Sequence, residues 1–317
     1  MPRQLIGAQM DRPDVIFIMG PTASGKTDLA MQLYDAMPSR LISVDSALVY
    51  RGLDIGSAKP APEELTRYPH DLIDICDPDE PYSASRFRED ALALIDKARA
   101  EERMPILVGG TMLYFKTLMQ GIADLPSADE EVRAQINREA VESGWSELHN
   151  QLASFDPESA ARIKPGDSQR IQRAIEVYRI SGKTLTEYFR EQEETALNLN
   201  VKSIAIAPQN RDILRERIRK RFKQMLSEGL VEEVRYLLEE QKYSPELPAL
   251  KSVGYRQVID YLSGEYDYDM MLEKAVTATS RLAKRQMTWL RSWPDVYWLE
   301  SGDETNLQKL VTALSKR

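Results

Sequence analysis

A loop near the N-terminus has the residue types and spacing that bind phosphate groups. Residues 20–27 read GPTASGKT and match the pattern G-x-x-x-x-G-K-[ST] at every position. Glycines let such a loop curl until successive backbone N–H groups face one anion, the lysine adds positive charge, and the last hydroxyl suits Mg²⁺. The motif predicts a site for a diphosphate or triphosphate, formed by Gly20, Pro21, Thr22, Ala23, Ser24, Gly25, Lys26 and Thr27. It leaves open what the phosphates are attached to.

A second candidate is the carboxylate of Asp45, which ends the apolar run LISVD. An aspartate at the carboxyl end of a buried parallel strand faces the crevice in which open α/β sheets bind ligands. Such a side chain is either a general base that takes a proton from a nucleophile or a cap for the following turn. A P-loop kinase also remains possible, because such enzymes hold Mg²⁺ with an aspartate in this position. Ser46, Tyr50 and Lys59 could line the same crevice.

These residues need elements that bring them together. Strands are predicted at Val15–Met19, Leu41–Val44, Ile106–Val108 and, more weakly, Asp71–Ile75, with helices over residues 25–36 and 83–100, the second capped by Ser83. Strands that alternate with helices indicate an α/β fold. We therefore predict a P-loop NTPase-like parallel sheet with helices on both faces.

The pattern changes beyond the first 115 residues. Helical periodicity runs from Tyr114 to about Thr195, Val201–Ala207 restores a strand, helical spacing continues to about Arg291, and Val296–Leu299 is a candidate edge strand. This order predicts an insertion within an α/β domain. The predicted catalytic core comprises residues 1–115 and 200–317, including C-terminal helices, and the predicted helical insertion domain comprises residues 116–199.

The composition narrows the possible functions and compartments. The chain of 317 residues is 42% hydrophobic and 29% charged, which is ordinary for a globular protein. It contains no apolar run long enough for a membrane span and no apolar signal segment near its first residue, so we expect no membrane attachment. The single cysteine, Cys76, excludes an internal disulfide and is expected to be a small buried side chain. With only two histidines, a histidine-rich metal site is also excluded, and the cytoplasm is the expected location.

The formal net charge of −8 conceals basic clusters. Residues 211–223 hold seven basic side chains against two acidic ones, and further clusters lie in residues 162–183 and 281–291. One such run usually marks a solvated helix face, whereas several in an acidic protein suggest a localised positive surface for a polyanion.

The motifs together resemble one enzyme family. GPTASGKT, DSALVYRGLDIGSAKP, VGGTMLY, SVGYRQ and RLAKRQMTWLR follow one another in the order found in bacterial tRNA dimethylallyltransferases, and they extend from residue 15 to about 291. A P-loop alone is shared with many unrelated enzymes, but this ordered set is specific. The resemblance implies that the chain transfers a dimethylallyl group from dimethylallyl diphosphate to the N6 amine of adenosine 37 in tRNA, with Mg²⁺ as cofactor.

The resemblance also implies roles for single residues. Thr22–Thr27 would bind the diphosphate, with Lys26, Thr27 and Mg²⁺ neutralising it. Asp45 matches the aspartate that hydrogen-bonds the adenine amine and accepts its proton, and Arg221 matches an arginine that reaches the diphosphate from the opposite side. The implied catalytic set is therefore Lys26, Thr27, Asp45 and Arg221.

The implied tRNA contacts lie in several segments. They are Asp45, Ser46, Ala47 and Leu48; Thr111; Arg133; Gln169, Arg170, Ile171, Gln172 and Arg173; Lys251, Ser252, Val253, Gly254, Tyr255 and Arg256; and Ala278, Thr279, Ser280, Arg281, Leu282, Ala283, Lys284 and Arg285. Ser280 stands where many relatives carry a basic residue, which removes one expected phosphate contact. Residues 251–256 could also be an ordinary helix start capped by Ser252.

The expected partner is the anticodon stem-loop of tRNA, because a single-stranded loop can release a base into a buried crevice at low cost. No obligate protein partner is evident, and we expect a monomer. A small-molecule kinase would leave the basic clusters unexplained, and a non-catalytic RNA-binding protein would leave the phosphate loop unexplained. An isopentenyltransferase acting on free adenine nucleotides is the nearest alternative, although the helical insertion favours a large RNA.

Overall fold

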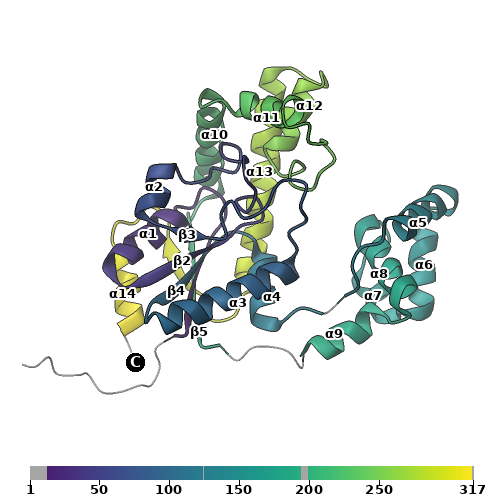
Figure 1. The fold of residues 1–317 in the computed structure, drawn as a ribbon, viewed down its shortest axis with the longest axis horizontal. Coiled ribbons are helices and arrows are strands. Elements are labelled where there is room, and N and C mark those ends of the chain that lie inside the picture. The colour runs from purple at the N-terminus through teal and green to yellow at the C-terminus, as the bar shows by residue number, and fades with distance from the viewer. Residues whose placement is uncertain (1–12, 124, 194–198, 316–317) are drawn as a thin grey trace, which may run out of the picture. The chain divides into compact units, whose positions relative to one another are not determined.

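The computed structural model describes residues 13–123, 125–193 and 199–315. It divides into two compact units, which we call the sheet unit (Met1–Phe115 with Leu199–Arg317) and the helical unit (Lys116–Asn198). Both appear in Figure 1, where colour follows the chain.

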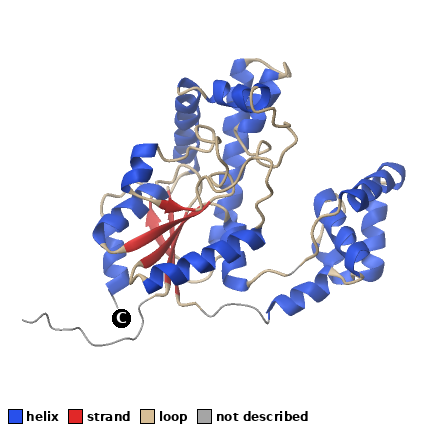
Figure 2. Ribbon diagram, viewed as in Figure 1, coloured by secondary structure: helices blue, strands red, loops and turns tan. Residues whose placement is uncertain are grey.

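The sheet unit is built on six strands in the order β3-β2-β4-β1-β5-β6, and every neighbouring pair is parallel. The strands, red in Figure 2, are β1 (Val15–Met19), β2 (Ser39–Val44), β3 (His70–Asp71), β4 (Met104–Gly109), β5 (Val201–Ala207) and β6 (Tyr297–Glu300). Because β1 lies between β4 and β5, the loop that follows it emerges near the middle of the sheet. The predicted parallel α/β sheet is confirmed.

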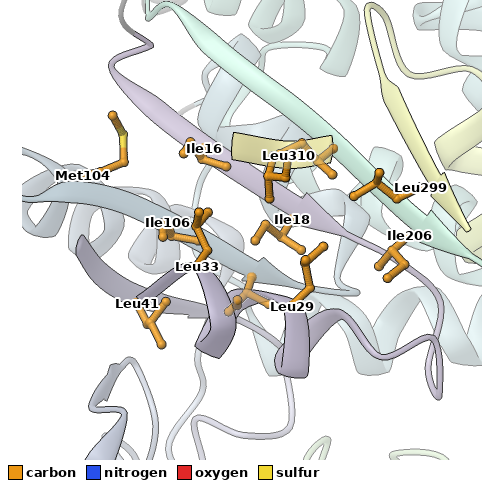
Figure 3. Close-up of a cluster of buried hydrophobic side chains, with 13 residues drawn as sticks. Ile16, Ile18, Leu29, Leu33, Leu41, Met104, Ile106, Ile206, Leu299 and Leu310 are labelled. Carbon is orange, nitrogen blue, oxygen red and sulfur yellow. The ribbon is translucent and has the colours of Figure 1, made fainter. Parts of the chain in front are cut away.

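Helices cover the sheet on both faces because its central strands are apolar throughout. All five residues of β1 are buried, as expected for a strand packed on two sides. Ile16 and Ile18 face Leu33 and Leu310 on one side, in the cluster shown in Figure 3. Phe17 points to the other side, where its ring centroid lies 4.9 Å from that of Phe115.

The helices of the sheet unit follow the strands in the expected alternation. Ser83 caps the helix predicted after it, since its hydroxyl accepts a hydrogen bond from the Arg86 N–H at 3.1 Å. The helices are α1 (Lys26–Ala36), α2 (Pro62–Arg67), α3 (Ala84–Ala100), α4 (Met112–Gln120), α10 (Arg211–Ser227), α11 (Leu230–Glu239), α12 (Tyr255–Leu262), α13 (Tyr268–Arg291) and α14 (Asn306–Ser315). Helix α4 begins in the sheet unit and ends in the helical unit.

In the described residues no helix combines the length and the apolarity that crossing a membrane requires.

The prediction of a strand over Asp71–Ile75 was wrong for most of its length. Strand β3 contains only His70 and Asp71. Leu72 has a φ of 63° and Asp74 a φ of 56°, so the chain enters the left-handed region, which a strand cannot contain. The apolar run that suggested a longer strand includes Leu72 and Cys76, which are buried below this irregular loop.

The helical unit contains the predicted helices and no strand among its described residues. They are α5 (Glu130–Ser143), α6 (Trp145–Phe155), α7 (Pro157–Arg162), α8 (Ser168–Ser181) and α9 (Leu185–Glu193). Ile136, Leu148, Leu152 and Ile171 belong to its own buried core. Aspartate side chains cap α5, α7 and α8 by accepting backbone N–H groups of the first turn.

Leu33 provides a test of the packing between α1 and the sheet. The Leu33→Ala variant should lose about 2–5 kcal/mol of unfolding free energy, because it removes buried methyl groups and leaves a cavity. The exposed Gln32, one residue earlier in the same helix, supplies the matched control Gln32→Ala. Urea unfolding measures both. Equal midpoints for the two variants would contradict the packing described here.

Candidate active site

A cavity of about 500 Å³ opens at the carboxyl ends of the central strands. Thr22 comes from the loop after β1 and Lys26 and Thr27 from the first turn of α1. Asp45 directly follows β2, Thr111 follows β4 by two residues, and both also line the cavity. Helices α10 and α13 contribute further walls. Its volume is in the range of small-molecule sites. Three strand ends thus bring together residues from distant parts of the chain.

The phosphate loop is held in a curled form by its glycines. Gly25 caps α1 with a φ of 81°, a conformation that favours glycine. A Cβ on Gly20 would lie 2.4 Å from the Ser24 Oγ and 2.6 Å from the Ile206 carbonyl oxygen, so no larger residue fits there. The loop therefore ends at the start of α1, where backbone N–H groups and the helix dipole favour an anion.

Two side chains far along the sequence brace this loop. The Thr22 N–H donates to Gln286 Oε1 at 3.0 Å, and Gln286 Nε2 donates to the Gly110 carbonyl oxygen at 3.0 Å. The Ser301 hydroxyl donates to the Ser24 carbonyl oxygen at 2.6 Å and accepts from Arg217 at 2.5 Å. Sequence reasoning missed Gln286 and Ser301, because neither belongs to a motif for phosphate binding. Gln286 also lines the cavity.

Two of the cations that line the cavity, Lys26 and Arg221, are poorly hydrated. Burial lowers the pKa of Lys26 to about 8; the attraction of Asp45 opposes this shift, and the repulsion of Arg221 adds to it. Burial likewise lowers the pKa of the Arg221 guanidinium. Lys26 Nζ lies 3.4 Å from the Pro21 carbonyl oxygen, within the loop itself. A bound anion would compensate Lys26 and Arg221 for the contacts with water that they lose on burial.

Asp45 caps the turn that follows β2 and also lines the cavity. Its Oδ1 accepts the Ala47 N–H at 2.9 Å and the Leu48 N–H at 3.4 Å, which is the geometry of a turn cap. The same side chain lines the cavity together with Lys26. The turn therefore fixes the carboxylate at the cavity wall.

Thr111 holds the segment after Asp45 in place. Its Oγ1 accepts the Ser46 N–H at 3.1 Å and lies 3.4 Å from the Ser46 hydroxyl. Close approach of the two strand ends permits this contact, because a Cβ on Gly109 would lie 2.0 Å from the Val44 carbonyl oxygen. The VGGT sequence thus packs β4 against β2 and presents Thr111 to the cavity.

One stripe of α13 lines the cavity at helical spacing. Thr279, Leu282, Arg285, Gln286 and Trp289 belong to it. On α10, Arg221 is accompanied by apolar side chains, namely Ile218, Phe222 and Met225. The cavity therefore combines a cationic end with apolar walls, which suits a ligand that has a phosphate group and a hydrocarbon part.

The predicted site residues separate into several groups. Those that line the cavity are Thr22, Lys26, Thr27, Asp45, Ser46, Ala47, Thr111, Arg221, Lys251, Ser252, Val253, Gly254, Tyr255, Thr279, Leu282 and Arg285. The remaining residues of the phosphate loop and Leu48, Arg256, Ala278, Ser280, Arg281, Ala283 and Lys284 are in the sheet unit but outside that lining. Ala283 is buried, so its side chain packs inside the protein and offers no exposed contact. Arg281 and Lys284 are exposed.

Three expectations around the cavity need correction. Tyr50 and Lys59 do not belong to its lining, since Tyr50 is buried and the Lys59 ammonium donates to the Tyr50 carbonyl oxygen at 3.0 Å. Ser252 is not the cap of the following helix. Helix α12 begins at Tyr255 after Gly254, whose N–H donates to Gln257 Oε1 at 2.9 Å.

The remaining predicted residues lie in the helical unit. Arg133 and Arg173 both pair with Glu176, at 2.9 Å and 2.8 Å, and the carboxylate itself is fully buried. Although burial opposes it, hydrogen bonds from Arg173, from the Asp129 N–H and from Arg133 hold the pKa of Glu176 below its usual value. Ile171 is a core residue, so its side chain packs within the unit. Gln169, Arg170 and Gln172 occupy the same helix, α8.

The fold and the cavity define an α/β protein with a parallel sheet and a site at the carboxyl ends of its strands. A family model described as IPP transferase matches residues 48–293. The chain belongs to this family, and it is a transferase. The family resemblance seen in the sequence motifs is confirmed.

The chain is similar to proteins of known activity or structure over almost its whole length. It is 52% identical to the tRNA dimethylallyltransferase 2 of Hahella chejuensis, with 96% of each chain covered. A solved tRNA isopentenylpyrophosphate transferase from Bacillus halodurans is 32% identical with a TM-score of 0.69, and the match covers 96% of this chain and 95% of that one. A eukaryotic dimethylallyltransferase solved acting on tRNA is 26% identical with a TM-score of 0.77, over 94% of this chain and 76% of that one.

Replacing Lys26 should stabilise the ligand-free protein. Because the pKa of Lys26 is about 8 in the folded chain against an ordinary value of 10.5, its charge costs stability below pH 8, and that cost disappears as the pH rises to 10.5. The Lys26→Met variant should therefore have the higher Tm at pH 7, with a difference that narrows above pH 8. Adding inorganic diphosphate should reverse the order, because the anion stabilises the charged lysine. A lower Tm for the variant without ligand would refute this prediction.

Proposed function

We propose that the chain transfers the dimethylallyl group of dimethylallyl diphosphate to the N6 amine of adenosine 37 in tRNA and releases diphosphate. The observation that carries this proposal is the shared cavity of the phosphate loop and Asp45. An anion site and a fixed carboxylate on one cavity suit a reaction in which a diphosphate leaves as a nucleophile loses a proton. Membership of the IPP transferase family supports the same reaction.

Stabilising the leaving group is the main catalytic task in this reaction. The adenine amine is a weak nucleophile, because its lone pair is delocalised into the ring. The allylic carbon tolerates positive charge as its bond to oxygen lengthens, so negative charge develops on the diphosphate. In our proposal the loop N–H groups, Lys26, Thr27 and Arg221 receive that charge, and they do so in a cavity where desolvation strengthens each interaction.

Asp45 completes the proton balance. A bond forms between N6 and the allylic carbon, the carbon–oxygen bond breaks with its electron pair on the diphosphate, and the N6 proton passes to the Asp45 carboxylate. The turn that uses Asp45 Oδ1 holds this carboxylate still. Full proton removal before attack is unnecessary, since the amine becomes far more acidic as the new bond forms.

The cavity also fits a magnesium ion held mainly by the substrate. The described residues contain no cluster of three or more His, Cys, Asp or Glu side chains that could hold a metal. Mg²⁺ at phosphate sites needs only one or two protein oxygens and completes its shell with phosphate oxygens and water. The Thr27 hydroxyl, which lies on the cavity wall, is suited to this. When bound, the ion would add positive charge beside the diphosphate.

The tRNA contacts proposed from the sequence fall on both units. On the sheet unit, residues 251–255 and the stripe of α13 line the cavity into which the target base must be extruded. Arg281 and Lys284 on the same helix are exposed and suited to phosphate contacts. In the helical unit, Arg133 and Arg173 are held by Glu176 and keep 43% and 29% of their side chains exposed. We propose that the protein acts on tRNA as a cytoplasmic monomer.

A single assay separates this proposal from its alternatives. The protein is incubated with Mg²⁺, dimethylallyl diphosphate or ATP, and either AMP or an anticodon stem-loop RNA with adenosine at position 37. Mass spectrometry then detects additions to the acceptor. A five-carbon addition to the RNA alone is expected. Addition to AMP alone would support an enzyme of free nucleotides, and phosphate transfer from ATP would support a kinase.

The Asp45→Asn variant separates the chemical role of Asp45 from its structural one. Asparagine keeps an oxygen that can accept the Ala47 N–H but cannot act as the base. We expect kcat to fall by about 10²–10⁴, the usual contribution of a general base. The affinity for dimethylallyl diphosphate and the Tm should stay near those of wild type. Turnover near the wild-type value would remove Asp45 from the proton transfer.

Salt dependence tests the proposed phosphate contacts of α13. The logarithm of RNA affinity should fall linearly with the logarithm of salt concentration, because each neutralised phosphate releases counterions. Replacing Lys284 by alanine should reduce that slope by about 1. Lys97, exposed on α3, provides the control Lys97→Ala with an unchanged slope. Binding titrations of the stem-loop at several salt concentrations measure both, and equal slopes in all three proteins would contradict the contact.

A further inference from the structure

One carboxylate on α11 joins two segments that are far apart in the sequence. Glu233 Oε2 accepts the N–H groups of Asp54 at 3.1 Å and Ile55 at 2.7 Å. Its Oε1 accepts the Gly56 N–H at 3.1 Å and the Tyr255 hydroxyl at 2.6 Å. Successive backbone N–H groups that converge on one anion form a strong local binding site. Here the anion is supplied by the protein itself.

Both segments form part of the cavity wall. Gly56 and Ser57 line it on one side of the contact, and residues 251–255 line it on the other. They also pack tightly, because a Cβ on Gly56 would lie 2.5 Å from the Tyr255 ring. Tyr255 is fully buried. Glu233 is not part of the cavity lining, so it can act only through these two segments.

Besides the contact with Glu233, a second set of contacts holds the loop of residues 54–59 in place. Lys59, whose side chain is only 5% exposed, donates to the Tyr50 carbonyl oxygen at 3.0 Å and forms ion pairs with Asp54 and Asp74. The Lys59 contacts connect this loop to the segment that follows Asp45, through the Tyr50 carbonyl oxygen. The Glu233 contacts connect the same loop to Tyr255 at the start of α12. The loop thus bridges the reacting end of the cavity and the wall formed by residues 251–255.

We propose that Glu233 is a positioning residue, which sets the wall formed by residues 56–57 and 251–255 so that it can receive the target nucleotide. The proposal rests on the proposed function, because the resemblance places tRNA contacts on residues 251–256. Loss of this carboxylate should move that wall without disturbing the phosphate loop, which is braced separately by Gln286 and Ser301. Loss of the carboxylate should therefore raise the KM for tRNA and leave the KM for dimethylallyl diphosphate nearly unchanged.

The Glu233→Gln variant tests this role with little change in shape. The glutamine amide has one acceptor oxygen where the carboxylate has two. Some of the backbone N–H groups and the Tyr255 hydroxyl that now donate to Glu233 would therefore lose their acceptor. Helix α11 should remain folded, because Leu230, Val234 and Leu237 anchor it in the interior. The KM for the stem-loop RNA should rise roughly tenfold, because the wall that receives the nucleotide is no longer held in its binding position by Glu233. The KM for dimethylallyl diphosphate should stay within about twofold of wild type.

Two further variants make the test specific. Glu232→Gln removes the adjacent charge on the same helix, from a side chain outside the contact, and should leave both KM values unchanged. Tyr255→Phe removes one donor to Glu233 and should give a smaller rise in the KM for RNA. Because Tyr255 and Glu233 share one bond, the two effects should be less than additive in the double variant.

The outcomes distinguish this proposal from the proposed function. If wild-type protein prenylates the stem-loop and Glu233→Gln raises only the KM for RNA, the positioning role is supported. Unchanged kinetics for Glu233→Gln, or losses shared equally by both substrates and matched by a lower Tm, would overturn it. Wild-type protein that transfers no prenyl group to any acceptor would overturn the proposed function itself.

Discussion

The electrostatic cost of holding two partly desolvated cations at one cavity is the constraint on which the rest of the site depends. Lys26 and Arg221 face one cavity, and burial lowers the pKa of both. Such groups are costly in the ligand-free protein and are stabilised when a diphosphate binds. The central position of β1 places the phosphate loop beside α10, which carries Arg221. The fold can thus be understood as the framework that keeps two partly buried cations near each other on one cavity wall.

Much of that framework comes from the C-terminal part of the chain. Gln286 on α13 and Ser301 after β6 contact the backbone of a loop near the start of the chain, with sequence separations of 264 and 277. Glu233 connects two further segments of the cavity wall. Helix α13 also carries the exposed basic residues proposed to contact tRNA. In the proposed function the same helix adjoins both substrates, because its stripe of cavity-lining residues lies beside these exposed basic residues.

Local patterns in the sequence were enough to predict the glycine-rich loop, the parallel sheet and the position of Asp45 at a strand end, whereas Thr111 was indicated only by the family resemblance. A short buried apolar run that is followed by glycine or by a carboxylate is typical of a parallel strand ending at the ligand-binding edge of an α/β sheet. Contacts between distant segments were not predictable, because Gln286, Ser301 and Glu233 are ordinary polar residues on helices or after a strand. The left-handed residues Leu72 and Asp74 interrupted a predicted strand for a related reason: apolar content reveals burial but not backbone conformation. The pairing of Arg133 with Glu176 likewise depends on the packing of α5 against α8, whereas Arg173 pairs with Glu176 within α8 itself.

The central claim is that departure of the diphosphate, stabilised by Lys26 and Arg221, governs the rate. The most direct measurement compares dimethylallyl diphosphate with an analogue that carries fluorine on one methyl group, under single-turnover conditions with saturating RNA. Fluorine withdraws electrons and destabilises positive charge on the allylic carbon, while the diphosphate that the loop binds is unchanged. The account predicts a transfer rate lower by at least about a hundredfold, which is roughly 2.7 kcal/mol in the barrier, with little change in binding affinity. An equal or faster rate with the fluorinated donor would contradict it.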